Sequence, residues 1–342
     1  MRKRTHRRGF AIATAVFTLV VVGALAMGTL FAAIHELRSG SDAVHQAGAV
    51  TGAELGVEQT IATWSHVWNG AFARGFGRSW SVATPEGAQL TVRLTRLADE
   101  LFLVASEARA GPARRQVARV VRLDAVNPVL VATLSALAAI DLSASARLDG
   151  TDRAPLGWDC PAPGPAVAPF AVSDSASLLR FGQFDWTALA EAATARLTPG
   201  MVSPSPRVAD QECDTTAPEN WGEPIKSSGT ACTSYYAIVH APGDLIVDGG
   251  RGQGLLIVDG DLTLRGSFEF FGVILVRGTL RSGSGGARIT GAASIGARDQ
   301  TSSSLGGLTI EFSRCAARKA LLGLASPIPI VERSWYEVFD PQ

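Results

Sequence analysis

The sequence predicts an α+β chain with three parts: a long N-terminal transmembrane helix, an antiparallel β-meander and a C-terminal, glycine-rich, β-helix-like repeat region. Three observations predict this fold class. Residues 10–34 carry no charge. Residues 90–123 alternate apolar and polar side chains between turn signals, as strands do. Glycines then recur every six residues from Gly254 to Gly278. The composition is 46% hydrophobic and 18% charged, which suits a chain with a sizeable core.

The charge is unevenly distributed. The formal net charge is zero, but the first eight residues hold five basic residues and no acid. These are Arg2, Lys3, Arg4, Arg7 and Arg8. The rest of the chain has 26 basic and 31 acidic residues, so it is mildly acidic. Because it has no basic patch, we expect no nucleic-acid partner.

The uncharged stretch predicts a membrane helix. As a helix, residues 10–34 would be about 37 Å long, enough to cross a hydrocarbon core of ~30 Å. We therefore expect a basic leader at 1–9 and a transmembrane helix at 10–35. The basic cluster predicts a cytoplasmic N-terminus, with the bulk of the chain outside a bacterial inner membrane that it crosses once. A buried core helix would leave this charge asymmetry unexplained.

The junction between leader and helix reads Arg7-Arg8-Gly9-Phe10. It resembles the class III signal of type IV pilins and pseudopilins. The resemblance implies that a prepilin peptidase cuts between Gly9 and Phe10 and leaves the helix on the mature protein. Major pilins carry Glu at the fifth mature position, where this chain has Thr14. That departure is similar to PilX-like minor pilins, and a plain uncleaved signal anchor remains the alternative.

A helical extension is expected over 36–70. Ala53, Val57, Ile61, Trp64 and Trp68 recur at helical spacing and form one apolar face. The preceding stretch carries Gly40, Gly48 and Gly52, each of which weakens a helix by roughly 1 kcal/mol. Small residues there allow a second helix to approach closely. The run Ala53-Glu54-Leu55-Gly56 resembles a segment that PilX-like proteins place after the membrane helix. The alternative is a stalk with one face packed on its own domain.

Residues 71–150 are expected to form a pilin-like meander. Its three strands cover Leu90–Leu94, Leu101–Ala105 and Val117–Leu123. Residues 151–232 are proline-rich and predict a linker with a short helix at 185–197. Asp185 is its expected N-cap, and Pro199-Gly200 ends it.

Residues 233–315 carry the repeat. Its glycines are Gly254, Gly260, Gly266, Gly272 and Gly278, and apolar residues stand two and four positions after each of the first four. A six-residue unit that turns a corner at glycine is typical of a β-solenoid, here of about three to five rungs. An antiparallel sandwich with glycine-rich turns is the alternative. Residues 316–342 are expected to be a C-terminal tail.

Four cysteines, Cys160, Cys213, Cys232 and Cys315, follow the membrane helix and should be oxidised outside the cytoplasm. Four cysteines allow three pairings. We favour Cys213 with Cys232, because closing that poorly packed loop would contribute ~3 kcal/mol. Cys160 and Cys315 would then form the second pair. No cysteine spacing fits a zinc site, and we expect no metal or cofactor.

The sequence shows no nucleophile elbow, no phosphate-binding loop and no HExxH motif, so we expect no enzyme. The whole pattern resembles PilX-like pilus-assembly proteins. The function implied is a minor pilin-like subunit of a type IV pilus or related filament, with a structural or priming role. Its implied partners are other pilin or pseudopilin subunits, the prepilin peptidase and the inner-membrane assembly machinery. The alternative is a static membrane-anchored envelope protein whose β-helix self-associates or binds glycan.

Overall fold

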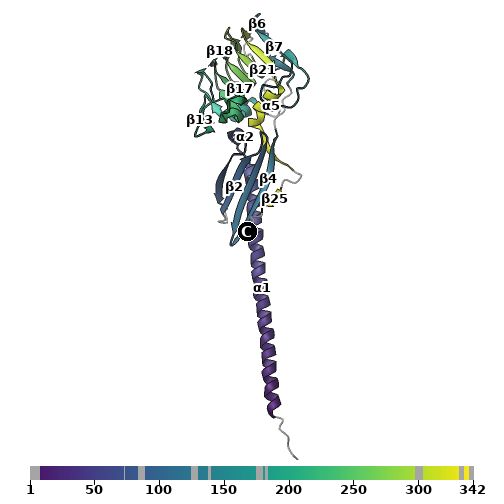
Figure 1. Cartoon of the computed structure of the whole chain (residues 1–342). Coiled ribbons are helices and arrows are strands. Elements are labelled where there is room, and N and C mark those ends of the chain that lie inside the picture. The colour runs from purple at the N-terminus through teal and green to yellow at the C-terminus, as the bar shows by residue number, and fades with distance from the viewer. Residues whose placement is uncertain are drawn as a thin grey trace, which may run out of the picture.

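The protein is described from a computed structural model that covers residues 8–72, 74–83, 89–124, 130–137, 140–174, 180–181, 184–296, 303–330 and 335–338. The fold is α+β, with one long apolar N-terminal helix and many strands arranged in sheets. The helix forms a stalk, an antiparallel sheet (the body) packs on its upper end, and two parallel sheets (the head) lie beyond the body (Figure 1).

Helix α1, Arg8–Ala62, has 55 residues and is therefore about 80 Å long. It ends earlier than the extension predicted to residue 70. The chain turns after Ala62, and a short helix α2, Trp68–Ala71, follows. The turn folds Trp64 back so that its ring packs edge-on against both Trp68 and Phe102. A continuous helix would carry these tryptophans past the sheet they cover.

The body is a meander with two added strands. Its strands are β1 (Gly77–Ala83), β2 (Gln89–Arg96), β3 (Leu101–Ala110) and β4 (Ala113–Asp124), each antiparallel to the next. Strands β24 (Ser326–Pro329) and β25 (Trp335–Val338) both pair antiparallel with β4. They come from the range 316–342, where a tail was expected, so the last residues of the chain complete the first sheet.

Alternation places the body's apolar face against α1. Leu90, Val92 and Leu94 of β2 are fully buried, as are Phe102 and Val104 of β3. Side chains of successive strand residues point to opposite faces, so these residues share one face of the sheet. They pack in two neighbouring apolar clusters with Val57 and Ala53 of the upper part of α1.

The head contains two parallel sheets between which the chain alternates. The first runs β11 (Ala195–Arg196), β15 (Ala237–Ala241), β17 (Arg251–Val258), β19 (Glu269–Val276), β21 (Arg288–Ile295), β23 (Thr309–Phe312) and β7 (Arg147–Asp149). Strand β5 (Ala132–Ala136) also pairs with β21, and β8 (Ala168–Val172) pairs with β5. The second runs β12 (Gly200–Val202), β16 (Leu245–Asp248), β18 (Leu262–Arg265), β20 (Leu280–Ser282), β22 (Ser303–Leu305) and β6 (Ile140–Leu142).

The register of these sheets corrects the six-residue unit. Leu256 of β17 pairs with Ile274 of β19, which lies 18 residues later, so three predicted units make one repeat of the pairing. Gly260, Gly266 and Gly278 lie between strands. Gly254 and Gly272, also predicted corners, instead lie inside β17 and β19 with positive φ of 122° and 144°. They pair with each other, so the glycines stack across neighbouring strands.

Both faces of the first sheet are apolar. One face, with Leu256 and Ile274, packs on the second sheet inside the head. The opposite face, with Leu255 and Val273, is covered by helix α5 (Arg314–Ala320) and the 3-10 turn η3 (Leu321–Leu324). These elements also come from the expected tail and its border.

The proline-rich range 151–232 contributes to the head as well. Its strands β8, β11 and β12 extend the parallel sheets. The expected helix is shorter than 185–197: α4 is Trp186–Glu191, and Asp185 Oδ1 caps it by accepting a hydrogen bond from the Ala188 amide at 2.8 Å. Smaller elements are β9 (Arg180–Phe181) paired with β10 (Phe184–Asp185), the hairpin β13 (Val208–Ala209) and β14 (Glu212–Cys213), and the 3-10 turns η1 (Lys226–Ser228) and η2 (Ala231–Ser234).

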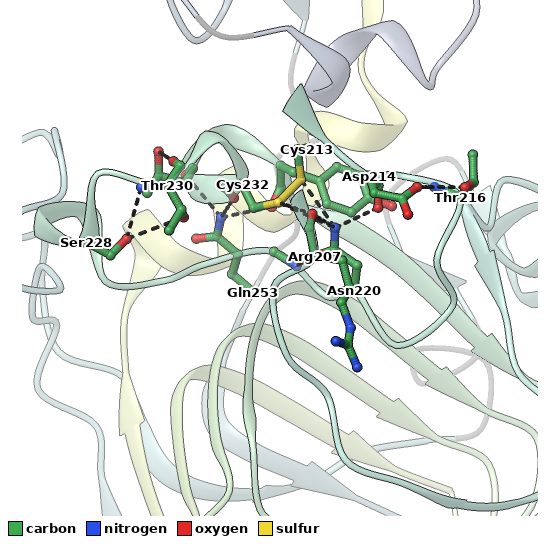
Figure 2. The surroundings of a disulfide bond; sticks show 12 residues. Arg207, Cys213, Asp214, Thr216, Asn220, Ser228, Thr230, Cys232 and Gln253 are labelled. Atoms are coloured by element: carbon green, nitrogen blue, oxygen red, sulfur yellow. Dashed lines mark hydrogen bonds between the residues drawn. A yellow bond between two sulfur atoms is a disulfide. The ribbon is translucent and has the colours of Figure 1, made fainter. Parts of the chain in front are cut away.

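Two disulfides fasten this range. Cys213 of β14 joins Cys232 of η2, and Cys160 joins Cys315 of α5, which are the pairs that the loop argument favours. Figure 2 shows the first disulfide beside the side-chain amide of Asn220. That fully buried amide donates to the carbonyl oxygens of Arg207 at 3.0 Å and Asp214 at 2.7 Å. The loop is thus held by a covalent bond and by a satisfied buried amide.

Candidate functional site

The lower part of α1 is the candidate site, because no other part of the described chain covers it. Every residue from Ile12 to Val44 is exposed, and large apolar side chains such as Phe17 and Phe31 are about seven-tenths exposed. In Figure 1 this length of helix extends away from the body and the head. Of the helices in the described residues, α1 is the one long and apolar enough to cross a membrane.

Two hydroxyls in the uncharged part of this segment are bonded within the helix. Thr18 Oγ1 donates to the Thr14 carbonyl at 2.8 Å, and Thr29 Oγ1 donates to the Ala26 carbonyl at 3.0 Å. A hydroxyl that donates to a carbonyl of its own helix needs no hydrogen-bond acceptor outside that helix. The uncharged residues 12–34 can therefore lie in an apolar medium, lipid or protein, without leaving these two hydroxyl donors unbonded.

The predicted leader residues are described only in part. Arg2, Lys3, Arg4 and Arg7 lie outside the described residues. The backbone of Arg8, Gly9 and Phe10 forms the first turn of α1, and their side chains are outside the description. The expected processing position therefore stays a prediction.

Three glycines of α1 form a seat for the body; we call Gly48, Gly52 and Gly56 the glycine seat. A Cβ atom on Gly48 would lie 3.4 Å from the Cβ of Ala110, and one on Gly52 would lie 3.0 Å from the Cβ of Ala108. The third glycine faces Ser106 in the same way.

The glycine seat shows which part of the fold the small residues of this stretch contact. The glycines are four apart on the helix, and their partners are two apart on β3, so one helix face meets one strand face. The small residues expected to admit a second helix therefore bring α1 onto its own sheet. Gly40, below the seat, faces open space.

Apolar and polar contacts flank the seat. Ala49, Ala53 and Val57 of α1 are fully buried against the body. At the margin, Arg119 on β4 reaches Glu58 at 2.5 Å. Such a partly exposed ion pair contributes up to about 1 kcal/mol, so burial around the glycines is the larger stabilising term.

Helix α2, which follows α1, is joined to the head through Asn69. Its amide nitrogen donates to the carbonyls of Leu322 at 2.7 Å and Ala325 at 2.9 Å, and its oxygen accepts from Trp64 Nε1 at 2.7 Å. Asn69 is almost fully buried. Helix α2 is thus held by the segment that leads from α5 to β24.

A second junction is ionic. The turn between β2 and β3 carries Asp99, which meets Lys319 of α5 at 2.6 Å, and Glu100, which meets Arg318 at 3.0 Å with both oxygens. Burial alone would raise the pKa of Asp99. The hydrogen bond and charge of Lys319, with the charge of Arg96, outweigh burial and hold that pKa below its usual value. The body turn and the head helix therefore form one charged contact.

Other chemistry is sparse in the described part of the chain. It contains no group of three or more His, Cys, Asp and Glu side chains placed to hold a metal ion. His240 and Asp259 are 3.1 Å apart, and Asp259 also accepts from Trp186 Nε1 at 2.5 Å, which ties α4 to the head. Sequence reasoning missed Gly56 as a seat residue, although its spacing of four from Gly52 was visible.

Comparisons with known proteins give a likeness among solved structures. No family model matches the chain, and no curated protein matches it. Among solved structures, it is similar to the competence-associated pilin ComZ from Thermus thermophilus, at 12% identity and a TM-score of 0.26, over 87% of this chain and 98% of that one. A TM-score this low leaves function to be argued from the geometry of α1.

Proposed function

We propose that this chain is a minor pilin-like subunit of a type IV pilus or a related filament, and that it assembles through the lower part of α1. The observation that carries the proposal is the uncovered apolar helix below a folded body and head. Exposed apolar surface costs roughly 25 cal/mol per Å² in water, so this segment needs either lipid or protein around it.

Membrane and filament can replace each other around such a segment. Lipid tails are as apolar as leucine, so helix association there depends on close packing rather than on expulsion of water. Gly23 and Gly28 have open space around them, and small residues of this kind admit a neighbouring helix. The subunit would leave the bilayer when the α1 helices of other pilin or pseudopilin subunits replace its lipid contacts.

Orientation and processing belong to the same proposal. The five basic residues before the helix favour a cytoplasmic N-terminus in the inner membrane, with body and head outside. Cleavage between Gly9 and Phe10 by a prepilin peptidase, followed by capture by the inner-membrane assembly machinery, would release the leader and keep α1. Thr14 in place of the usual Glu favours a minor, priming subunit of the PilX-like kind over a major fibre subunit.

We further infer that the head is a short β-helix. Parallel pairing at an 18-residue interval, strands that alternate between two sheets, and stacked Gly254 and Gly272 all support this inference. Each circuit of the chain adds one strand to each of the two sheets. The two sheets together enclose one continuous core, as in solenoids.

Intact mass of the protein extracted from membranes tests the filament role. The expected species begins at Phe10, lacks residues 1–9 and carries one added methyl group. A Gly9→Val variant should keep its leader and stay in the membrane fraction, whereas Gly40→Ala, a matched change in the uncovered helix, should be processed normally. An unprocessed mass in all three proteins would favour the static envelope anchor and overturn the assignment.

A further inference from the structure

Leu156 is the most exposed large apolar side chain in the described chain, at 98%. It stands at the tip of a tight turn, in which the Trp158 amide donates to the Pro155 carbonyl at 3.2 Å. Gly157 has φ of 76°, the left-handed value that this turn position needs. The backbone thus presents the leucine outward.

The turn is anchored on both sides. Trp158 is buried, donates from Nε1 to the Pro224 carbonyl at 2.9 Å and stacks on Phe271. Two residues later, Cys160 is bonded to Cys315 of α5. These contacts fix the turn, so Leu156 cannot fold back onto the head. An apolar side chain held in place before binding loses little conformational freedom when it is buried by a partner.

The same loop borders a cavity of about 370 Å³. Its apolar walls include Leu130, Ala154, Pro161 and Ala317, and the charged residues Asp152, Arg314 and Arg318 also line it. The volume is ample for one leucine side chain. Asp159, an exposed acid directly after the turn that carries Leu156, has the charge that Arg314 would attract, whereas Arg318 is already paired with Glu100.

We propose that this loop is a contact surface for a second copy of the chain, in which Leu156 of each copy enters the cavity of the other. Residues 152–163 carry Leu156 and form one side of the cavity, while Leu130 and α5 form the rest, so a two-fold axis beside this loop would bring each leucine to the cavity of the other copy. Such a contact is self-complementary and closes at the dimer. Asp159 lies at the rim and pairs with Arg314 of the other copy. The contact joins two heads and leaves α1 free.

Association of the full-length chain in detergent tests the proposal. Multi-angle light scattering over a concentration series should show a dimer, and Leu156→Glu should weaken it at least about tenfold, as for a buried anchor side chain. Met201→Glu on β12 is the control, because Met201 is also strongly exposed but lies in the end strand of the second sheet and does not line the cavity. A monomer at every concentration, an unchanged dimer of Leu156→Glu, or equal weakening by Met201→Glu would each overturn the proposal.

A photo-crosslinker at position 156 gives an independent test. A benzophenone amino acid there should join two chains, and peptide mapping should place the bond near Pro161 or in α5. Bonds to α1 of the second chain would mean that the helices alone drive association, and the head contact would then be wrong. Association through α1 would persist in Leu156→Glu, whereas association through the head would be weakened. The variant therefore distinguishes the two modes of association.

Discussion

Gly56 of α1 lies directly against Ser106 of β3. A Cβ atom built on Gly56 would collide with the Ser106 hydroxyl and lie 3.1 Å from the Ser106 Cβ. Both groups are buried, so neither has room to move aside. The stalk and the body therefore meet at a point where the helix has no side chain.

Gly56→Ala should destabilise the body by about 1–3 kcal/mol, because overpacking outweighs the roughly 1 kcal/mol that alanine adds to helix propensity. Gly40→Ala is the matched control, since nothing surrounds Gly40, and it should leave unfolding of the body unchanged. Thermal unfolding followed by tryptophan fluorescence measures both, because all seven tryptophans lie beyond residue 63. Equal melting of the two variants would contradict the close contact.

Gly272→Ala should destabilise the head by about 2–4 kcal/mol. Its φ of 144° strains any side chain, and a Cβ there would meet the Gly254 carbonyl and lie 3.0 Å from the Ala320 Cβ. Gly283→Ala, with open space around it, should stay within about 0.5 kcal/mol. Denaturant unfolding gives the free energy of unfolding of each variant. A Gly272→Ala variant as stable as Gly283→Ala would contradict the close stacking of Gly272 on Gly254.

Asn220→Asp should destabilise the head by at least about 1–3 kcal/mol. The change turns a buried amide donor into an oxygen that faces the carbonyls of Arg207 and Asp214. Gln211→Glu makes the same amide-to-acid change at an exposed position of the β13–β14 hairpin and should be nearly neutral. Chemical denaturation with the disulfides intact distinguishes them; similar midpoints would mean that the amide is not the donor in Figure 2.

Lys226 predicts a pH dependence. Burial, with a smaller contribution from the charge of Lys319, lowers the pKa of Lys226 to about 7. Its amine donates to Gln253 Oε1 at 2.9 Å and lies 4.3 Å from the centre of the Trp158 ring. The unfolded chain keeps the proton up to a pKa of about 10.4, so between pH 7 and 10 it binds more protons than the folded chain.

The free energy of unfolding should therefore rise with pH above 7, by up to about 1.4 kcal/mol per unit, and Lys226→Met should remove this rise. Unfolding by urea at pH 7, 8 and 9 measures the slope in both proteins. A wild-type slope no steeper than that of Lys226→Met would show that the amine stays charged, held by its acceptors and the ring.

The sequence predicts α1 well because absence of charge over 25 residues is a local property. The contact partner of the glycine seat is different. Gly56 and Ser106 are 50 residues apart, and spacing on the helix alone does not distinguish a second helix from a strand. The candidate site, the uncovered apolar segment of α1, could be predicted from the sequence. The sheet on which the upper part of α1 packs could not.

Short strands explain the other differences. Strands β11 and β12 have two and three residues, which is too few to show alternation. The prolines of the range 151–232 therefore led to the prediction of a linker there. Strand β24 contains Pro327 and Pro329, residues that normally indicate a break. They are tolerated because β24 lies at an edge of the body. Pairing supplied by strands far away in sequence makes these segments regular.

The closing of the body by β24 and β25 has a consequence for biogenesis. Strand β4 ends at Asp124, and its neighbour β24 begins at Ser326, so about 200 residues separate them. At ~5–20 residues per second, a ribosome needs about 10–40 s to make that interval. During this time the nascent chain holds an open β4 edge, a template for unwanted pairing. Truncation at the carboxyl end would make that exposure permanent and mark the protein for aggregation or proteolysis.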